Sequence, residues 1–137
     1  MKTTAVIHKL IRACVDDERT LRHESRFVDP ARAATLMKLA AEREQFVTEL
    51  EPFEGTASSR VGSMAELSRE VGRDLWVTAG GPNIGDAITA CRHSRARTEA
   101  AYEHALREYL PDPVLDVLTE QRGRLHDEIA VLDQLRA

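Results

Sequence analysis

A near-repeat of four residues constrains the fold of this chain more than any other feature. Residues 11–14 read IRAC, and residues 88–91 read ITAC. Each copy lies early in a segment with helical spacing of apolar residues. Each is followed, four residues after its cysteine, by a charged residue on the apolar side: Glu18 in the first copy and Arg95 in the second. Duplicated helix pairs with ionisable groups in the core are typical of di-iron carboxylate bundles. We therefore expect two similar helix pairs.

Composition favours a single domain built by helix-on-helix packing. The 137 residues are 42% hydrophobic and 31% charged, as in a globular domain, and only 4% are aromatic, so the core must be mainly aliphatic. The net charge of −4 argues against general binding to nucleic acid, which requires a clustered basic surface. No apolar run approaches the roughly 20 residues of a membrane span, and no signal-peptide pattern opens the chain. We expect a cytoplasmic protein with reduced thiols.

Helical periodicity runs through most of the chain. Apolar residues three or four positions apart predict four long helices, over about 3–28, 30–51, 84–109 and 113–135. The same spacing predicts a short helix over 63–78. The clearest heptad lies in the third long segment and consists of Ile88, Cys91, Arg95, Thr98, Tyr102, Ala105 and Tyr109. The apolar stripe of the last segment consists of Leu118, Leu125, Ile129, Leu132 and Leu135.

Two of the long helices share a start signal. Asp29-Pro30 and Asp112-Pro113 each place a capping aspartate before a proline at the first helical position. Two helix pairs joined by a long connection are typical of ferritin-like bundles. The predicted fold is therefore all-α: a single ferritin-like four-helix bundle over residues 1–137, made of two helix pairs, with a long crossover that contains the short connecting helix.

Several short motifs, taken in order, resemble a known family. They are CVDDE at 14–18, LAAEREQF at 39–46, GSM at 62–64, AYEHAL at 101–106, and the turn at Pro111. Together they resemble an uncharacterised bacterial family of ferritin-like four-helix-bundle proteins, the domain of unknown function DUF2383. The resemblance covers nearly the whole chain. The resemblance implies the bundle fold, but it implies no activity, because the activity of the family is not established.

The wider ferritin-like superfamily places a Glu on each of two helices and a Glu-x-x-His on each of the other two. Glu18 fits the first of these positions, but Arg95 stands where the third helix should carry a Glu, and Arg43 interrupts the apolar face of the second helix. A guanidinium cannot ligate a cation and repels one at close range. We therefore predict no metal, but a buried polar network formed by Glu18, Arg43, Arg95 and Gln121.

A metal site is the alternative interpretation. Counted from the two Asp-Pro signals, Arg43 corresponds to His126. If the helices are rotated relative to the predicted stripes, a site for iron or manganese forms from Glu18, Glu42, Glu99 and His126.

The two cysteines occupy equivalent places in the duplicated helices. Cys14 and Cys91 are therefore expected to be small buried side chains that face each other across the core. The alternatives are a redox pair or a soft-metal site, although neither cysteine belongs to a Cys-x-x-Cys motif.

Taken together, these patterns predict a non-enzymatic structural or interaction module without a cofactor, with a stress-related role by family analogy. The alternative is a degenerate iron- or manganese-binding protein, either an oxidoreductase or a metal store. The predicted connecting helix carries an apolar strip that needs a cover, so we expect a homodimer. The strip consists of Leu67, Val71, Leu75 and Trp76.

Overall fold

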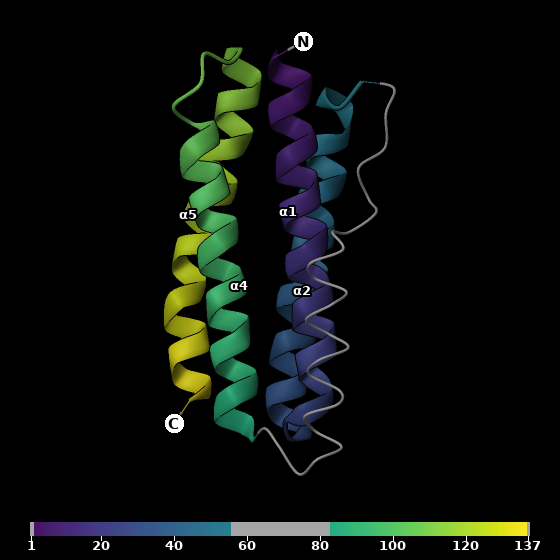
Figure 1. Ribbon diagram of the computed structural model, residues 1–137, viewed down its shortest axis with the longest axis vertical. Coiled ribbons are helices and arrows are strands. Elements are labelled where there is room, and N and C mark those ends of the chain that lie inside the picture. The colour runs from purple at the N-terminus through teal and green to yellow at the C-terminus, as the bar shows by residue number, and fades with distance from the viewer. Residues whose placement is uncertain (1, 56–82, 137) are drawn as a thin grey trace.

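The computed structural model describes residues 2–55 and 83–136, which form four long α-helices and contain no β-strand (Figure 1). These helices are α1 (Lys2–Glu24), α2 (Pro30–Leu50), α4 (Ile84–Ala105) and α5 (Asp112–Leu135). Short 3-10 turns, Ser25–Phe27 and Glu51–Phe53, follow α1 and α2. The predicted connecting helix over 63–78, with the apolar strip from which we predicted a homodimer, lies outside the described residues. No helix in the described ranges is long and apolar enough to cross a membrane.

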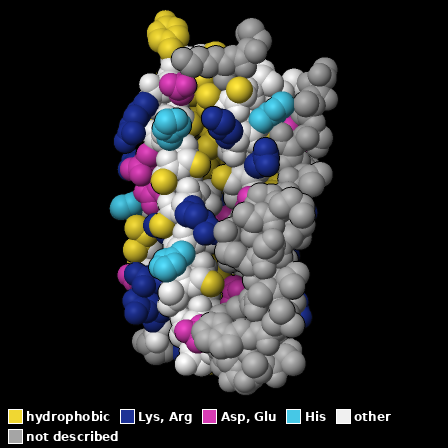
Figure 2. Space-filling view, viewed as in Figure 1, with side chains coloured by type: hydrophobic (Ala, Val, Ile, Leu, Met, Phe, Trp, Pro, Cys, Tyr) yellow, Lys and Arg dark blue, Asp and Glu magenta, His cyan; other side chains and the backbone are white. Residues whose placement is uncertain are grey.

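The four helices form two antiparallel pairs that pack side by side. In Figure 1, α1 runs down from the N-terminus and α2 returns upward; α4 also runs upward, and α5 runs down to the C-terminus. α1 packs against both α2 and α4, and α4 packs against α5. α1 and α4 are therefore antiparallel, as are α2 and α5. On the face shown in Figure 2, basic, acidic and histidine side chains are interspersed over the described helices.

The two predicted Asp-Pro start signals behave differently. Asp29 caps α2 as predicted: its carboxylate accepts a hydrogen bond from the backbone N–H of Arg32 at 3.2 Å, and Pro30 is the first helical residue. The prediction for Asp112 is wrong, because α5 begins at Asp112 itself and its N-cap is Pro111, which makes no side-chain cap. Asp112 is already helical, so its carboxylate does not occupy the capping position.

Helix α4 ends earlier than predicted. It stops at Ala105, and the following backbone amides close turns that lead to Pro111. Tyr109, predicted as the last heptad position, therefore lies beyond the helix and is 96% exposed. At its other end α4 carries a capping box, in which Asn83 and Asp86 exchange side-chain-to-backbone hydrogen bonds.

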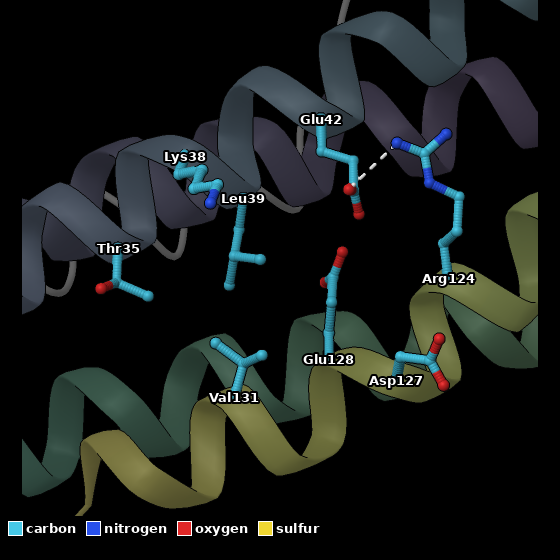
Figure 3. A pocket seen from close by; sticks show the side chains of 8 residues that line it. All are labelled: Thr35, Lys38, Leu39, Glu42, Arg124, Asp127, Glu128 and Val131. Carbon is cyan, nitrogen blue, oxygen red and sulfur yellow. Dashed lines mark hydrogen bonds and ion pairs between the residues drawn. The ribbon is translucent and has the colours of Figure 1, made fainter.

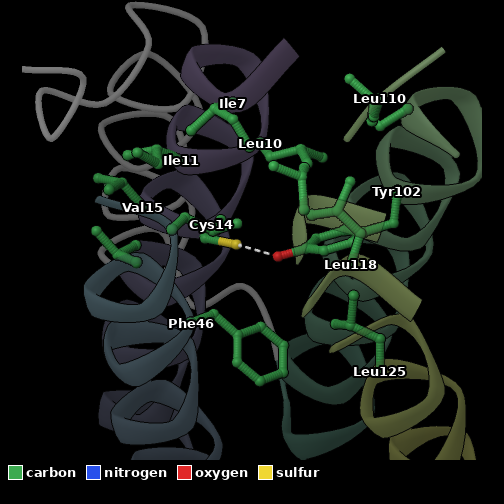
Figure 4. Close-up of a cluster of buried hydrophobic side chains, with 14 residues drawn as sticks. Ile7, Leu10, Ile11, Cys14, Val15, Phe46, Tyr102, Leu110, Leu118 and Leu125 are labelled. Carbon is green, nitrogen blue, oxygen red and sulfur yellow. Dashed lines mark hydrogen bonds between the residues drawn. The ribbon is translucent and has the colours of Figure 1, made fainter. Parts of the chain in front are cut away.

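The core is divided into two apolar clusters along the bundle axis. The first cluster includes the aromatic rings of Phe46 and Tyr102, as Figure 4 shows. The second lies toward the opposite end, where Leu36, Ile88 and Leu132 meet. Between the two clusters the core positions of the helices carry polar and charged side chains. This interruption of the core holds the candidate site.

Candidate functional site

Arg43 on α2 is the largest fully buried side chain among the described residues. Its Nε donates a hydrogen bond to Oδ2 of Asp17 on α1 at 2.7 Å, and its Nη2 donates to Oε1 of Glu128 on α5. The second oxygen of Asp17 accepts a 2.5 Å hydrogen bond from the hydroxyl of Ser94 on α4. These four residues, which we call the Arg43 cluster, therefore join all four described helices.

Heptad spacing explains why charged residues lie in the core. On α1, alternating steps of four and three residues lead from Leu10 through Cys14 and Asp17 to Leu21, and all four are buried. The prediction instead took a second step of four, from Cys14 to Glu18. On α5 the same alternation leads to Glu128 rather than to Ile129. A strict heptad would have identified both acidic members of the cluster.

Burial and neighbouring charges shift the ionisation of the cluster. Burial alone would lower the pKa of Arg43, but the charges of Asp17 and Glu128 raise it above its ordinary value. Burial raises the pKa of Glu128 to about 8, and the facing carboxyl of Glu42 adds to this rise while Arg43 opposes it. Glu128 therefore retains a proton at neutral pH. Arg43 stays charged and is neutralised chiefly by Asp17.

A groove between α2 and α5 opens beside the cluster (Figure 3). Its cavity has a volume of about 350 Å³ and is lined by Thr35, Lys38, Leu39, Glu42, Arg124, Asp127, Glu128 and Val131. The side chains of Glu42 and Glu128 point toward each other across it. Arg124 donates a hydrogen bond to Glu42 at 3.1 Å. Burial acts to raise the pKa of Glu42, but the Glu128 carboxyl and Arg124 hold it below its usual value.

The structure does not bring the four residues of the predicted network together. Arg43 is the only one of them in the Arg43 cluster. Glu18 is partly exposed and forms an i,i+4 ion pair with Arg22 at 2.9 Å, because it lies one position away from the buried stripe. Arg95 is buried and pairs with Glu99 on its own helix.

Gln121, the fourth predicted member, belongs to a separate chain of hydrogen bonds. It is fully buried, accepts a hydrogen bond from the hydroxyl of Tyr102 at 2.6 Å, and donates to Glu49 at 2.8 Å. The sulfur of Cys14 lies 3.3 Å from the same hydroxyl (Figure 4). Since the Tyr102 proton goes to Gln121, the thiol of Cys14 donates to the Tyr102 oxygen. Burial raises the pKa of Cys14 to about 12, which makes the thiol unreactive.

The prediction that the two cysteines face each other is wrong. Cys14 lies in the first apolar cluster and Cys91 in the second. Because α1 and α4 run antiparallel, equivalent positions of the duplicated helices meet only near the middle of the pair. Asp17 and Ser94, which do contact each other, are such a pair of equivalent positions.

The alternative metal ligands are also dispersed. His126 lies 3.3 Å from Glu99, which pairs with Arg95. Glu42 lines the groove, and Glu18 pairs with Arg22 on its own helix. Within residues 2–55 and 83–136, no three histidine, cysteine or acidic side chains are placed to hold a metal ion together.

No family model, curated protein or solved structure matches the chain. The class of protein is therefore described from its fold and site alone. The described residues form an all-α protein of four long helices, and an arginine is buried in its core among acidic side chains from two of these helices.

Proposed function

We propose that this chain is a non-enzymatic structural or interaction module, a ferritin-like bundle in which Arg43 supplies the interior positive charge that metal ions supply in di-iron bundles. One observation carries the proposal. The fully buried Arg43 guanidinium is bound by Asp17 from α1 and Glu128 from α5, between two apolar clusters. In a di-iron bundle, carboxylates projecting inward from several helices surround the metals in the same way.

The chemistry of the cluster supports an arginine in place of a metal. A guanidinium carries five N–H donors and no lone pair, so it occupies carboxylate oxygens that a metal would otherwise bind. A cation placed beside Arg43 would also meet repulsion in a medium of low dielectric constant. Such buried ion pairs rarely add stability over an apolar core, but they can specify how helices align.

The resemblance to DUF2383 supports the ferritin-like part of the proposal. The order of the described helices agrees with it, because α2 and α4 run in the same direction while each helix pair is antiparallel (Figure 1). Bundles with a single long connection between two antiparallel pairs have this arrangement. We place the protein in the bacterial cytoplasm, as a homodimer, as part of the same proposal.

Elemental analysis tests the proposal. The protein is produced with iron and manganese supplementation, purified without tag or chelator, and assayed for bound metal. We expect far less than one metal ion per chain, and a melting temperature that a chelator does not change. About two metal ions per chain would overturn the proposal in favour of an iron- or manganese-binding protein.

A further inference from the structure

Two carboxyl groups face each other across the groove between α2 and α5. The side chains of Glu42 and Glu128 point toward each other (Figure 3), and a hydrogen bond joins them. Two ionised carboxylates have no N–H or O–H to donate, so this bond requires a proton on one of the two groups. We call Glu42 and Glu128 the carboxyl pair.

The proton of the carboxyl pair belongs to Glu128. Its side chain is only 5% exposed, whereas that of Glu42 is 27% exposed and also accepts a hydrogen bond from Arg124 at 3.1 Å. Oε1 of Glu128 accepts from Arg43, and Oε2 accepts from none of the described residues, as expected for the oxygen that carries the proton. Burial raises the pKa of Glu128 to about 8, and the bond to Glu42 adds to this rise. The carboxyl pair therefore holds one proton at neutral pH.

No neighbouring group can take the place of this proton. Asp17 holds Arg43, Glu120 pairs with Arg124 on its own helix, and His126 lies against Glu99. The other ionisable groups near the carboxyl pair are Cys14 and Asp17 on α1, Lys38 and Arg43 on α2, Arg95 and Glu99 on α4, and Glu120, Arg124, His126 and Asp127 on α5. Of these described groups, only Arg43 donates a hydrogen bond to Glu128, and it does so at Oε1.

Helices α2 and α5 pack loosely at this point. Their backbones approach each other far less closely than those of α1 and α2, of α1 and α4, or of α4 and α5. A cavity of about 350 Å³ lies between them, and Leu39 and Val131 line it beside the carboxyl pair (Figure 3). Polar contacts across the groove therefore contribute more to holding these two helices together than they do between the closely packed helices.

Loss of the shared proton turns the attraction within the carboxyl pair into repulsion. The ion pair with Arg43 becomes stronger at Oε1 of Glu128, but Arg43 is fully buried and also holds Asp17, so it does not reach Oε2. Oε2 is then a buried charged atom without a donor, and it faces the carboxylate of Glu42. Both the repulsion and the missing donor are costly in a medium of low dielectric constant. Water relieves both effects, and it can enter beside the partly exposed Glu42.

We propose that the carboxyl pair is a pH-dependent switch: its shared proton keeps α2 and α5 together at the groove, and loss of that proton to the solvent moves them apart and lets water reach Leu39 and Val131. This goes beyond the proposed structural role, because it assigns the protein a conformational response to pH. Arg43 and Asp17 stay paired in both states, so the change is local to the groove. Since Glu128 loses its proton above a pH of about 8, the groove is closed at pH 6.5 and open at pH 9.5.

Hydroxyl-radical footprinting read by mass spectrometry tests the proposal, because it measures how far solvent reaches individual side chains. The wild-type protein is oxidised at pH 6.5 and at pH 9.5, and an added reference peptide corrects for differences in radical dose. We expect several-fold more oxidation of Leu39 and Val131 at pH 9.5, and no change at Leu10, which lies in the first apolar cluster. No increase at Leu39, or an equal increase at Leu10, would overturn the proposal.

Matched variants assign the response to the carboxyl pair. In Glu128→Gln the amide oxygen accepts from Arg43 and the amide N–H donates to Glu42 at both pH values, so Leu39 should stay protected at pH 9.5. Asp116→Asn makes the same change at an exposed position of α5, and should respond like the wild type. Circular dichroism confirms that each variant is folded. A wild-type increase at Leu39 in folded Glu128→Gln would overturn the proposal. If that variant does not fold, Glu42→Gln, which removes the facing carboxylate, is judged by the same outcome.

Discussion

The surroundings of Glu128 have opposing effects on its pKa. Arg43 favours its carboxylate, while burial and the facing carboxyl of Glu42 favour its protonated form, and the outcome is a pKa raised to about 8. At neutral pH Glu128 therefore carries a proton and no charge, and the Arg43 cluster has no net charge.

This proton makes stability depend on pH. Between the ordinary value of 4.5 and about 8, the folded protein holds a proton on Glu128 that the unfolded chain has already lost. The contribution of this group to the free energy of unfolding is therefore fully present below pH 4.5 and is lost as the pH rises toward 8. Urea denaturation of the wild type and Glu128→Gln at a series of pH values measures it.

The stability of the wild type relative to Glu128→Gln should fall as the pH rises across this window, because the amide does not titrate. Asp116→Asn, on the exposed side of α5, should keep the pH dependence of the wild type. A constant difference between wild type and Glu128→Gln from pH 5 to pH 8 would contradict this prediction.

Cys14 is protected from reaction by the same physical effect. It is fully buried, and its pKa is raised to about 12, so almost none of it is thiolate at neutral pH. We predict that a thiol reagent such as 5,5′-dithiobis(2-nitrobenzoic acid) reacts with neither Cys14 nor Cys91 in the folded protein, and with both in denaturant. Rapid reaction of a thiol in the folded state would show that the core is less closed than the structure indicates.

At the scale of the helix, the two Asp-Pro signals make a matched pair. Asp29 accepts from the backbone of Arg32 and also pairs with its side chain at 2.8 Å, whereas Asp112 makes no cap. We predict that Asp29→Ala lowers the melting temperature clearly more than Asp112→Ala does, because only the first change removes a cap. Thermal denaturation by circular dichroism compares the two. Equal effects would mean that the Asp29 cap contributes nothing specific.

The periodicity of single helices predicts most of the fold. It predicts four long helices and their buried faces, and it identifies Arg43 as a charged core residue. Its error at Glu18 is one of register. From Cys14, a step of three residues leads to Asp17 and a step of four leads to Glu18, and both positions lie near the apolar stripe. Only the strict heptad, which alternates steps of four and three, selects the buried Asp17. The end of α4 was missed for another reason, since the turn toward Pro111 begins several residues before the proline itself.

The partners of each core residue are a property of the assembled helices. Arg43 meets Glu128, and Tyr102 meets Gln121, only because α2, α4 and α5 lie at particular rotations and offsets. Periodicity within one helix carries no information on these offsets. The groove that Glu42 and Glu128 share is for the same reason invisible in the sequence.

At the scale of the whole molecule, the Arg43 cluster joins all four described helices through polar contacts, between two apolar clusters. Taking these ions from water is costly, so the cluster is not expected to make the bundle more stable than an apolar core would. It does penalise any alignment of the helices in which Asp17 lacks its guanidinium. We infer that the cluster specifies one alignment of the four helices.

The most direct test of this account is the free energy of unfolding of Arg43→Met, measured by urea denaturation beside the exposed control Arg12→Met on α1. The variant leaves Asp17 buried without its cation, and we predict a loss of about 3–5 kcal/mol, while the control changes stability by less than about 0.5 kcal/mol. Replacing the whole charged set, as Asp17→Leu, Arg43→Met and Glu128→Leu together, should recover most of that loss. A loss below about 1 kcal/mol in Arg43→Met would contradict the claim that Arg43 is the interior cation of this bundle.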